Sequence, residues 1–269
     1  MGPGIGEVAL LGTVQGVSEF LPISSSGHLA LAEILFGSRG GLVLDVMLQA
    51  GTLLATIVVL RQQVALAVLE GAKGLLHPSQ FRTSAGGRDA LVVIVASLPT
   101  LLLGLALEPV VQHWKTSPLV VGVGLLATAA ILVSTRWVRA GKLEVPTLLG
   151  AVLIGVVQGL AVVPGMSRSG STIALALWLG VRPDRAFELS MLLSVPAVLV
   201  PVLLESRALS ASAAVLGAAL LGALVAFAVG VVALLVLRRV VVRGHFSLFA
   251  LWVLPIAIAT LAMAKAWPG

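Results

Sequence analysis

The sequence contains no cysteine and few charged residues, and both absences narrow the classes of protein it can belong to. Without cysteine, disulfide bridges, thiolate metal sites and a cysteine nucleophile are all excluded. Only 10% of the 269 residues are charged, whereas 59% are hydrophobic and the mean hydropathy is +1.12. No soluble globular domain has this composition, which is typical of a helical protein with many membrane spans.

Two further features are missing. The N-terminus lacks the basic region and cleavage site of a secretory signal, so we expect the first apolar stretch to remain in the mature protein. No run of basic residues suggests nucleic-acid binding, although the formal net charge is +6. The basic residues lie mostly between apolar stretches, where they set orientation and meet anionic lipid headgroups. We therefore expect membrane lipids, and no nucleic acid, as partners.

Six apolar stretches reach the length of about 20 residues that crosses a bilayer as a helix. They cover residues 42–60, 90–109, 117–135, 187–204, 211–237 and 246–266. Two further segments, 5–36 and 146–180, each hold two shorter apolar pieces around a polar break. The second piece of each is too short to cross alone, so each segment is predicted to enter the membrane and return as a re-entrant hairpin.

The prediction is an all-α polytopic membrane protein with an inverted-topology repeat. Each half, residues 1–143 and 144–269, has one re-entrant hairpin followed by three transmembrane helices. Because three is odd, the second half is inverted relative to the first, and the two halves together form one membrane domain. Twelve basic residues then fall on one side and four on the other, which are Arg39, Lys115, Arg207 and Lys265. The positive-inside rule makes the richer side cytoplasmic and places both termini on the periplasmic side.

Two polar segments repeat at an offset of 143 residues. They are Ser24-Ser25-Ser26-Gly27-His28 and Ser167-Arg168-Ser169-Gly170-Ser171. The offset extends further, since Gly12, Gln15, Gly16, Gly37, Arg39 and Asp45 map onto Gly155, Gln158, Gly159, Gly180, Arg182 and Glu188. Polar breaks in apolar stretches are tolerated where they line a cavity, and two at matching positions predict one composite site near the midplane. The small-xxx-small glycine pairs are compatible with close helix packing.

Each polar segment leads directly into the N-terminus of a short helix, which is a natural anion site. Two such ends would suit a group with two negative centres, such as a diphosphate. Serines there are also common helix caps, and that alternative remains open. Arg168 favours phosphate binding, because a guanidinium at this depth is costly and its fork suits phosphate oxygens. The alternative for Arg168 is an internal ion pair with Glu19.

Glu19 and His28 are the other ionisable residues expected at this depth. Glu19 follows Gln15 by four residues, which puts both on one helical face. The carboxylate could act as a general base or bind a divalent cation. His28 could be a nucleophile, a proton donor or a base that activates Ser25, and its alternative is a structural hydrogen bond. Asp45 and Glu188 could support the site or could simply lie at the membrane surface.

These residues resemble a known family. Gln15-Gly16-Val17-Ser18-Glu19 through His28 resembles the (Glu/Gln)xxxGlu-plus-serine-histidine region of bacterial undecaprenyl diphosphate phosphatases, also called bacitracin-resistance proteins. Pro164-Gly165-Met166-Ser167-Arg168-Ser169 through Thr172 is similar to the family's PGxSRSxxT motif. Glutamine at position 15 leaves Glu19 as the only acid of the pair, which weakens a two-carboxylate metal site.

The resemblance implies hydrolysis of undecaprenyl diphosphate to undecaprenyl phosphate and inorganic phosphate in the bacterial inner membrane. This reaction recycles the lipid carrier for peptidoglycan synthesis, depends on a divalent cation such as Mg²⁺ or Ca²⁺, and confers bacitracin resistance. By the same resemblance the catalytic group is Glu19, Ser25, His28 and Arg168, with Glu19 as the possible metal ligand. The expected substrate-binding residues are Gln15, Ser24, Ser26, Gly27, Ser167, Ser169, Gly170 and Thr172.

The main alternative is a lipid-phosphate transporter or flippase, because inverted repeats and a midplane anion site are also typical of transporters. Hydrolysis is favoured because an anion transporter needs hydrogen-bond donors but no buried acid and base. The oligomeric state is not indicated by the sequence.

Overall fold

The computed structural model describes residues 4–36, 41–114, 116–206 and 213–266, and nearly all of them are helical. No strand occurs within those ranges, apart from an isolated bridge between Leu143 and Val181. Six helices are long and apolar enough to cross a membrane. They are α3 (Leu42–Val59), α6 (Ala85–Trp114), α7 (Pro118–Ser134), α10 (Pro183–Ser206), α11 (Ala213–Val242) and α12 (Ala250–Ala266). The predicted all-α membrane fold with six spans is therefore confirmed, and the chain is a multi-pass membrane protein.

The two predicted hairpins are helix–loop–helix units of shorter helices. The first consists of α1 (Ile5–Ser18) and α2 (Ser25–Phe36), and the second of α8 (Leu148–Leu160) and α9 (Arg168–Trp178). The longest of these, α1, has 14 residues. At 1.5 Å per residue it extends about 21 Å, which is less than the hydrocarbon core of about 30 Å. None of the four can therefore cross a bilayer as a straight helix.

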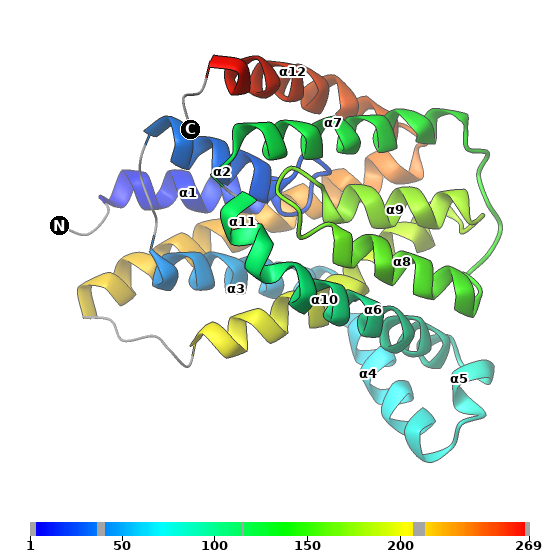
Figure 1. Cartoon of the computed structure of the whole chain (residues 1–269). Helices are drawn as coiled ribbons and strands as arrows, with labels where there is room; N and C mark the ends of the chain where they lie inside the picture. The colour runs from blue at the N-terminus through cyan, green and yellow to red at the C-terminus, as the bar shows by residue number, and fades with distance from the viewer. Residues whose placement is uncertain (1–3, 37–40, 115, 207–212, 267–269) are drawn as a thin grey trace.

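Glycine pairs let each hairpin pack against a span of the opposite half. A Cβ at Gly12 or Gly16 of α1 would lie within 3 Å of backbone oxygens of α11, namely 2.7 Å from Gly222 O and 2.8 Å from Ala226 O. A Cβ at Gly155 of α8 would lie 2.1 Å from Ala96 O of α6. Each hairpin thus packs on a span from the other half of the chain. This arrangement is compatible with the predicted inverted repeat, which stays a prediction, as does its orientation in the membrane. In Figure 1, α7 and α12 run side by side along one edge of the bundle.

The connection between the first two spans contains two helices. Residues 61–76 form α4 (Arg61–Leu76), followed by α5 (Gln80–Thr83), and both project from the bundle in Figure 1. Gly71 and Gly74 are buried, while Leu75 and Leu76 are 73% and 78% exposed. The next helix, α6, begins five residues before the predicted span at residue 90, because residues 85–89, which include the charged Arg88 and Asp89, are helical as well.

Candidate functional site

The loops of the two hairpins touch each other inside the bundle. A Cβ at Gly27 would lie 3.0 Å from the Cα of Gly165, and one at Gly170 would lie 3.2 Å from the Cβ of Pro22. The Ser24 hydroxyl lies 3.4 Å from the Met166 carbonyl oxygen, to which it donates. A side chain at Gly27 would press on the Gly165 backbone, and one at Gly170 would press on Ser167 and Pro22, so glycine allows the close approach of the loops. The structure therefore brings together the two polar segments that the sequence repeat singled out.

Both segments use the same capping arrangement. The Ser24 hydroxyl accepts from the Gly27 amide at 3.2 Å, and the Ser167 hydroxyl accepts from the Gly170 amide at 3.1 Å. Each of these hydroxyls also lies near the serine two residues later, Ser26 at 3.2 Å and Ser169 at 3.3 Å. The same hydrogen bonds thus occur at positions 143 residues apart in the two segments. For Ser24 and Ser167 the capping interpretation describes the observed contacts.

The second loop is fixed to α7 by a residue that the sequence analysis did not identify. The Thr128 hydroxyl donates to the Gly165 carbonyl at 2.8 Å and accepts from the Ser167 amide at 2.9 Å. Gly124 lies one turn earlier, and a Cβ there would be 2.2 Å from the Pro164 carbonyl oxygen. The sequence feature that could have identified this contact is a glycine followed four residues later by a threonine on an apolar helix. They hold the loop so that Arg168 begins α9 at the junction of the hairpins.

Glu19 is the centre of the polar contacts at this junction. Its Oε1 lies 2.5 Å from Nη2 of Arg168, and its Oε2 accepts from the Ser25 hydroxyl at 3.1 Å and from Gln15 Nε2 at 3.2 Å. The Arg168 and Glu19 side chains are 19% and 14% exposed. The ion pair considered as the alternative for Arg168 is therefore present. It does not use the whole guanidinium, because Nη1 is buried without a hydrogen-bond partner.

His28 lies beside this group but makes different hydrogen bonds. Its Nδ1 is 2.9 Å from the Ser24 carbonyl oxygen, and its Nε2 accepts from Nε1 of Trp252 in α12 at 3.3 Å. The hydrogen bond from Ser25 goes to Glu19 and not to His28. The arrangement therefore joins Ser25 to the carboxylate, whereas the histidine is held separately.

The predicted hydroxyl donors of α9 are occupied inside the protein. Thr172 donates to the Arg168 carbonyl at 2.8 Å and lies 2.6 Å from the Ser190 hydroxyl. Thr172, Ser167 and Ser169 are each no more than 2% exposed. The polar side chains at the junction that stay partly accessible are those of Glu19, Ser25, Ser26, His28 and Arg168.

Asp45 and Glu188, which the sequence analysis paired, lie in different surroundings. Asp45 is exposed in the first turn of α3, as expected for a residue at the membrane surface. Glu188 is 8% exposed and belongs to a second polar cluster at the start of α10. Neither forms a hydrogen bond with Glu19, Ser25 or Arg168 among the contacts of the described residues.

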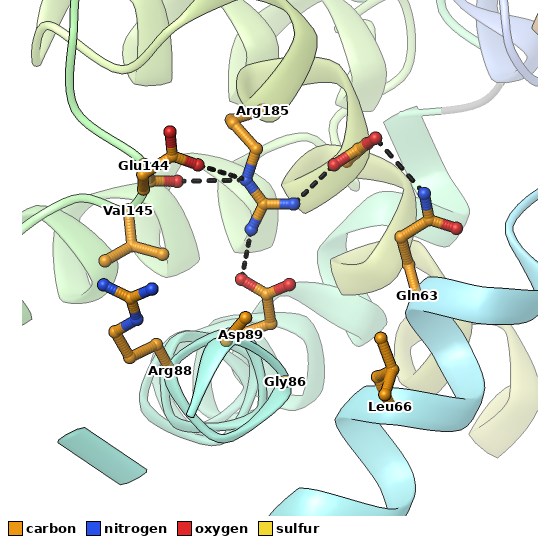
Figure 2. Close-up of a pocket in the computed structure, with 10 residues that line it drawn as sticks. Gln63, Leu66, Gly86, Arg88, Asp89, Glu144, Val145 and Arg185 are labelled. Atoms are coloured by element: carbon orange, nitrogen blue, oxygen red, sulfur yellow. Dashed lines mark hydrogen bonds and ion pairs between the residues drawn. The ribbon is translucent and has the colours of Figure 1, made fainter. Parts of the chain in front are cut away.

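This second cluster, which we call the Arg185 hub, was not predicted. Arg185 forms ion pairs with Asp89 of α6 and with Glu188, and its Nε lies 3.5 Å from Oε2 of Glu144. Gln63 of α4 donates to Glu188 at 3.2 Å. Figure 2 shows Arg185 directed toward Glu144 and Asp89 at the edge of a pocket of about 190 Å³. The hub connects three helices with the segment before α8.

Comparison with known proteins identifies relatives that match this chain over nearly its whole length. Residues 8–259 match the family model described as bacitracin resistance protein BacA. An undecaprenyl-diphosphatase of Korarchaeum cryptofilum is 38% identical over 262 residues, which cover 96% of this chain and 99% of the relative. An undecaprenyl-diphosphatase of Desulfosudis oleivorans is 42% identical over 251 residues, covering 90% and 92% of the two chains. A third, from Acaryochloris marina, is 38% identical over 260 residues, covering 95% and 96%. The resemblance drawn from the two motifs is thereby confirmed, and the chain belongs to the BacA family of bacitracin resistance proteins.

Proposed function

We propose that this chain is an integral membrane undecaprenyl-diphosphatase, which hydrolyses undecaprenyl diphosphate to undecaprenyl phosphate and inorganic phosphate. The family match and the shared name of the curated relatives support the activity and the lipid substrate. The observation that carries the chemistry is the Glu19 carboxylate, which contacts Arg168 through one oxygen and Ser25 through the other. An acid, a hydroxyl and a cation are thus gathered between six apolar spans.

Arg168 is the residue best suited to bind the diphosphate. Its Nη1 has no hydrogen-bond partner, and a guanidinium presents paired donors that match phosphate oxygens. The N-termini of α2 and α9 both adjoin Glu19, and their dipoles favour negative charge at the same place. As the diphosphate binds, Arg168 turns toward its oxygens and stabilises the charge that develops on the transferred phosphoryl group.

Ser25 is the nucleophile that these contacts favour. Its hydroxyl already donates to Glu19 Oε2, so the carboxylate can accept the proton as Oγ attacks the terminal phosphorus. A bond forms between Oγ and phosphorus, the bridging phosphorus–oxygen bond breaks, and undecaprenyl phosphate leaves. Water then cleaves the serine phosphate, releasing inorganic phosphate and restoring the hydroxyl. Direct attack by water or by His28 remains the alternative, and His28 has the weaker claim because both its ring nitrogens are engaged elsewhere.

A divalent cation fits the site only as a companion of the substrate. Among the described residues no group of three His, Cys, Asp or Glu side chains could hold a metal ion. Glu19 and the amide oxygen of Gln15 would be its protein ligands, with phosphate oxygens and water completing a shell of the kind that Mg²⁺ prefers. When bound, such an ion would neutralise charge on the diphosphate.

The remaining hydroxyls are proposed to act indirectly. Ser24 and Ser167 cap the two short helices, Ser26 and Ser169 lie beside these caps, and Thr172 donates to the Arg168 carbonyl. Gly27 and Gly170 allow the two loops to approach each other closely. The transporter alternative is not favoured, because the curated relatives are named for a hydrolytic activity. We also propose the inner-membrane location that the family implies and, by the distribution of basic residues, periplasmic termini. Of the four basic residues on the outer side, Arg39, Lys115 and Arg207 lie outside the described residues.

The test is release of inorganic phosphate from a polyprenyl diphosphate by the purified chain in detergent. Parallel reactions contain Mg²⁺, Ca²⁺ or a chelator. We expect release with a divalent cation and little with the chelator. Absence of release under all of these conditions would refute the phosphatase assignment, and release that is unchanged by chelator would refute the cation.

A further inference from the structure

The two ring nitrogens of His28 have partners of opposite character. Nδ1 lies 2.9 Å from the carbonyl oxygen of Ser24, which can only accept a hydrogen bond. Nε2 lies 3.3 Å from the indole Nε1 of Trp252, which can only donate. Both contacts are satisfied together only when the proton is on Nδ1 and Nε2 keeps its lone pair. The surroundings of His28 therefore select one neutral tautomer.

The position of Trp252 is fixed by the packing of the helix that carries it. Ala250, Val253 and Ala257 are at most 4% exposed and form one buried stripe of α12. The helix is preceded by Phe246, which is 2% exposed and packs edge-to-face on Phe249 with ring centroids 6.2 Å apart. This anchoring sets the rotation of α12, so that Trp252 falls beside the buried stripe and not within it.

The indole thus lies at the boundary between the site and the outer surface. Trp252 is 58% exposed, although its N–H reaches His28 of α2 across 224 residues of sequence. Tryptophan suits this place because its apolar body can face lipid while its single donor remains hydrogen-bonded. Contact with lipid would explain why Trp252 is exposed. It would not explain why the indole N–H points toward His28.

We propose that Trp252 is a positioning residue that holds His28 in the Nδ1-protonated tautomer and fixes the orientation of its imidazole ring beside the site. This inference rests on the proposed phosphatase function. Trp252 acts through His28 and makes no hydrogen bond to Glu19, Ser25 or Arg168 among the described contacts. The carbonyl of Ser24 supplies the second constraint, and it is itself fixed because Ser24 caps α2 through its hydroxyl.

The decisive variant is Trp252→Phe, which keeps a smaller aromatic ring against lipid and removes the hydrogen-bond donor. We expect kcat for phosphate release to fall about tenfold with KM unchanged, by analogy with the lower end of the loss when the partner that orients a metal-binding histidine is removed. The matched control is Trp137→Phe, at a residue that is 73% exposed in the turn after α7, and it should leave kcat unchanged. In a His28→Gln background, Trp252→Phe should cause no further loss.

A spectroscopic measurement separates positioning from general packing. In chain labelled with ¹⁵N-histidine, the wild-type ring of His28 should show a protonated Nδ1 and an unprotonated Nε2, and Trp252→Phe should mix the two tautomers. Unchanged ring signals, or an unchanged kcat, would overturn the proposal. A wild type that releases no phosphate would instead refute the phosphatase function, while the ring signals would still decide whether Trp252 sets the tautomer.

Discussion

Glu19 and Arg168 are separated by 149 residues and form an ion pair, with Oε1 and Nη2 2.5 Å apart, where the two hairpin loops meet. Each residue comes from a different half of the repeat. In the duplicated pattern the counterpart of Glu19 is Val162 and that of Arg168 is Ser25. Glu19, Ser25 and Arg168 therefore stand at positions where the two halves differ. The capping serines and glycines around these three residues stand at positions where the two halves agree.

The structural and catalytic parts of this ion pair can be separated by neutralising both partners. Glu19→Gln or Arg168→Gln alone should lower thermal stability in detergent, because each leaves a partly buried charge without its partner. The double variant Glu19→Gln/Arg168→Gln should regain most of that stability and still lose phosphate release by about 10²-fold or more. Thermal unfolding and the phosphate assay on the same preparations make the comparison. A double variant with near-wild-type activity would mean that the pair is only structural.

Ser25 and His28 should differ in their contribution to the reaction. Ser25→Ala removes the group that donates to Glu19, so phosphate release should fall on the order of 10³-fold or more. His28→Ala should cost less, about 10²-fold, because the ring makes no hydrogen bond to Glu19 or Ser25 among the described contacts. Rapid-quench samples analysed by intact-protein mass spectrometry should show a phosphoryl adduct in the wild type and none in Ser25→Ala. The reverse order of effects would assign the nucleophile to His28.

The Arg185 hub should contribute to stability and not to chemistry. Arg185→Met would leave Asp89 and Glu188, whose side chains alone are 7% and 11% exposed, without their shared partner. We expect a loss of about 3 kcal/mol in unfolding free energy, with kcat of the folded fraction retained. Arg182→Met is the control, because Arg182 is 44% exposed and its ion pairs lie at the surface, where such pairs contribute little. Equal destabilisation by the two variants would contradict the distinction drawn here between buried and exposed pairs.

The packing of α4 against the start of α6 should depend on pH through Glu70. Hydrogen bonds from the Ser84 hydroxyl and from the Gly86 and Gly87 amides hold the pKa of this carboxyl below its ordinary value of 4.5. Because the pKa is lower in the folded state, the ionised carboxylate favours folding above that value. The contribution is lost as the pH falls below 4.5 and through the folded pKa. Hydrogen exchange of α4 and α5, corrected for intrinsic rates, should accelerate at acidic pH in the wild type. In Glu70→Gln the exchange should be faster already at neutral pH and should change little on acidification.

Hydropathy and the motif repeat predicted the spans, the two hairpins and the residues at their junction, because these depend on local composition and on a fixed offset. The same reasoning left the partner of Arg168 open, since a helical period places Gln15 beside Glu19 but cannot set the distance to the other half. Thr128, Trp252 and the Arg185 hub were missed for a related reason. Each acts through contacts between helices, and the rotation of one helix against another follows from side-chain packing and not from the hydropathy of either.

The packing of α1 on α11 and of α8 on α6 also sets an order of events during synthesis. The first hairpin emerges from the ribosome some 200 residues before α11, the span on which Gly12 and Gly16 rest. Until that span is inserted, Glu19 has no completed bundle around it, and Trp252 follows later still. The nascent chain would thus hold its polar loops in lipid or at the translocon for most of translation. The hydrolytic centre is therefore among the last parts of the molecule to be assembled.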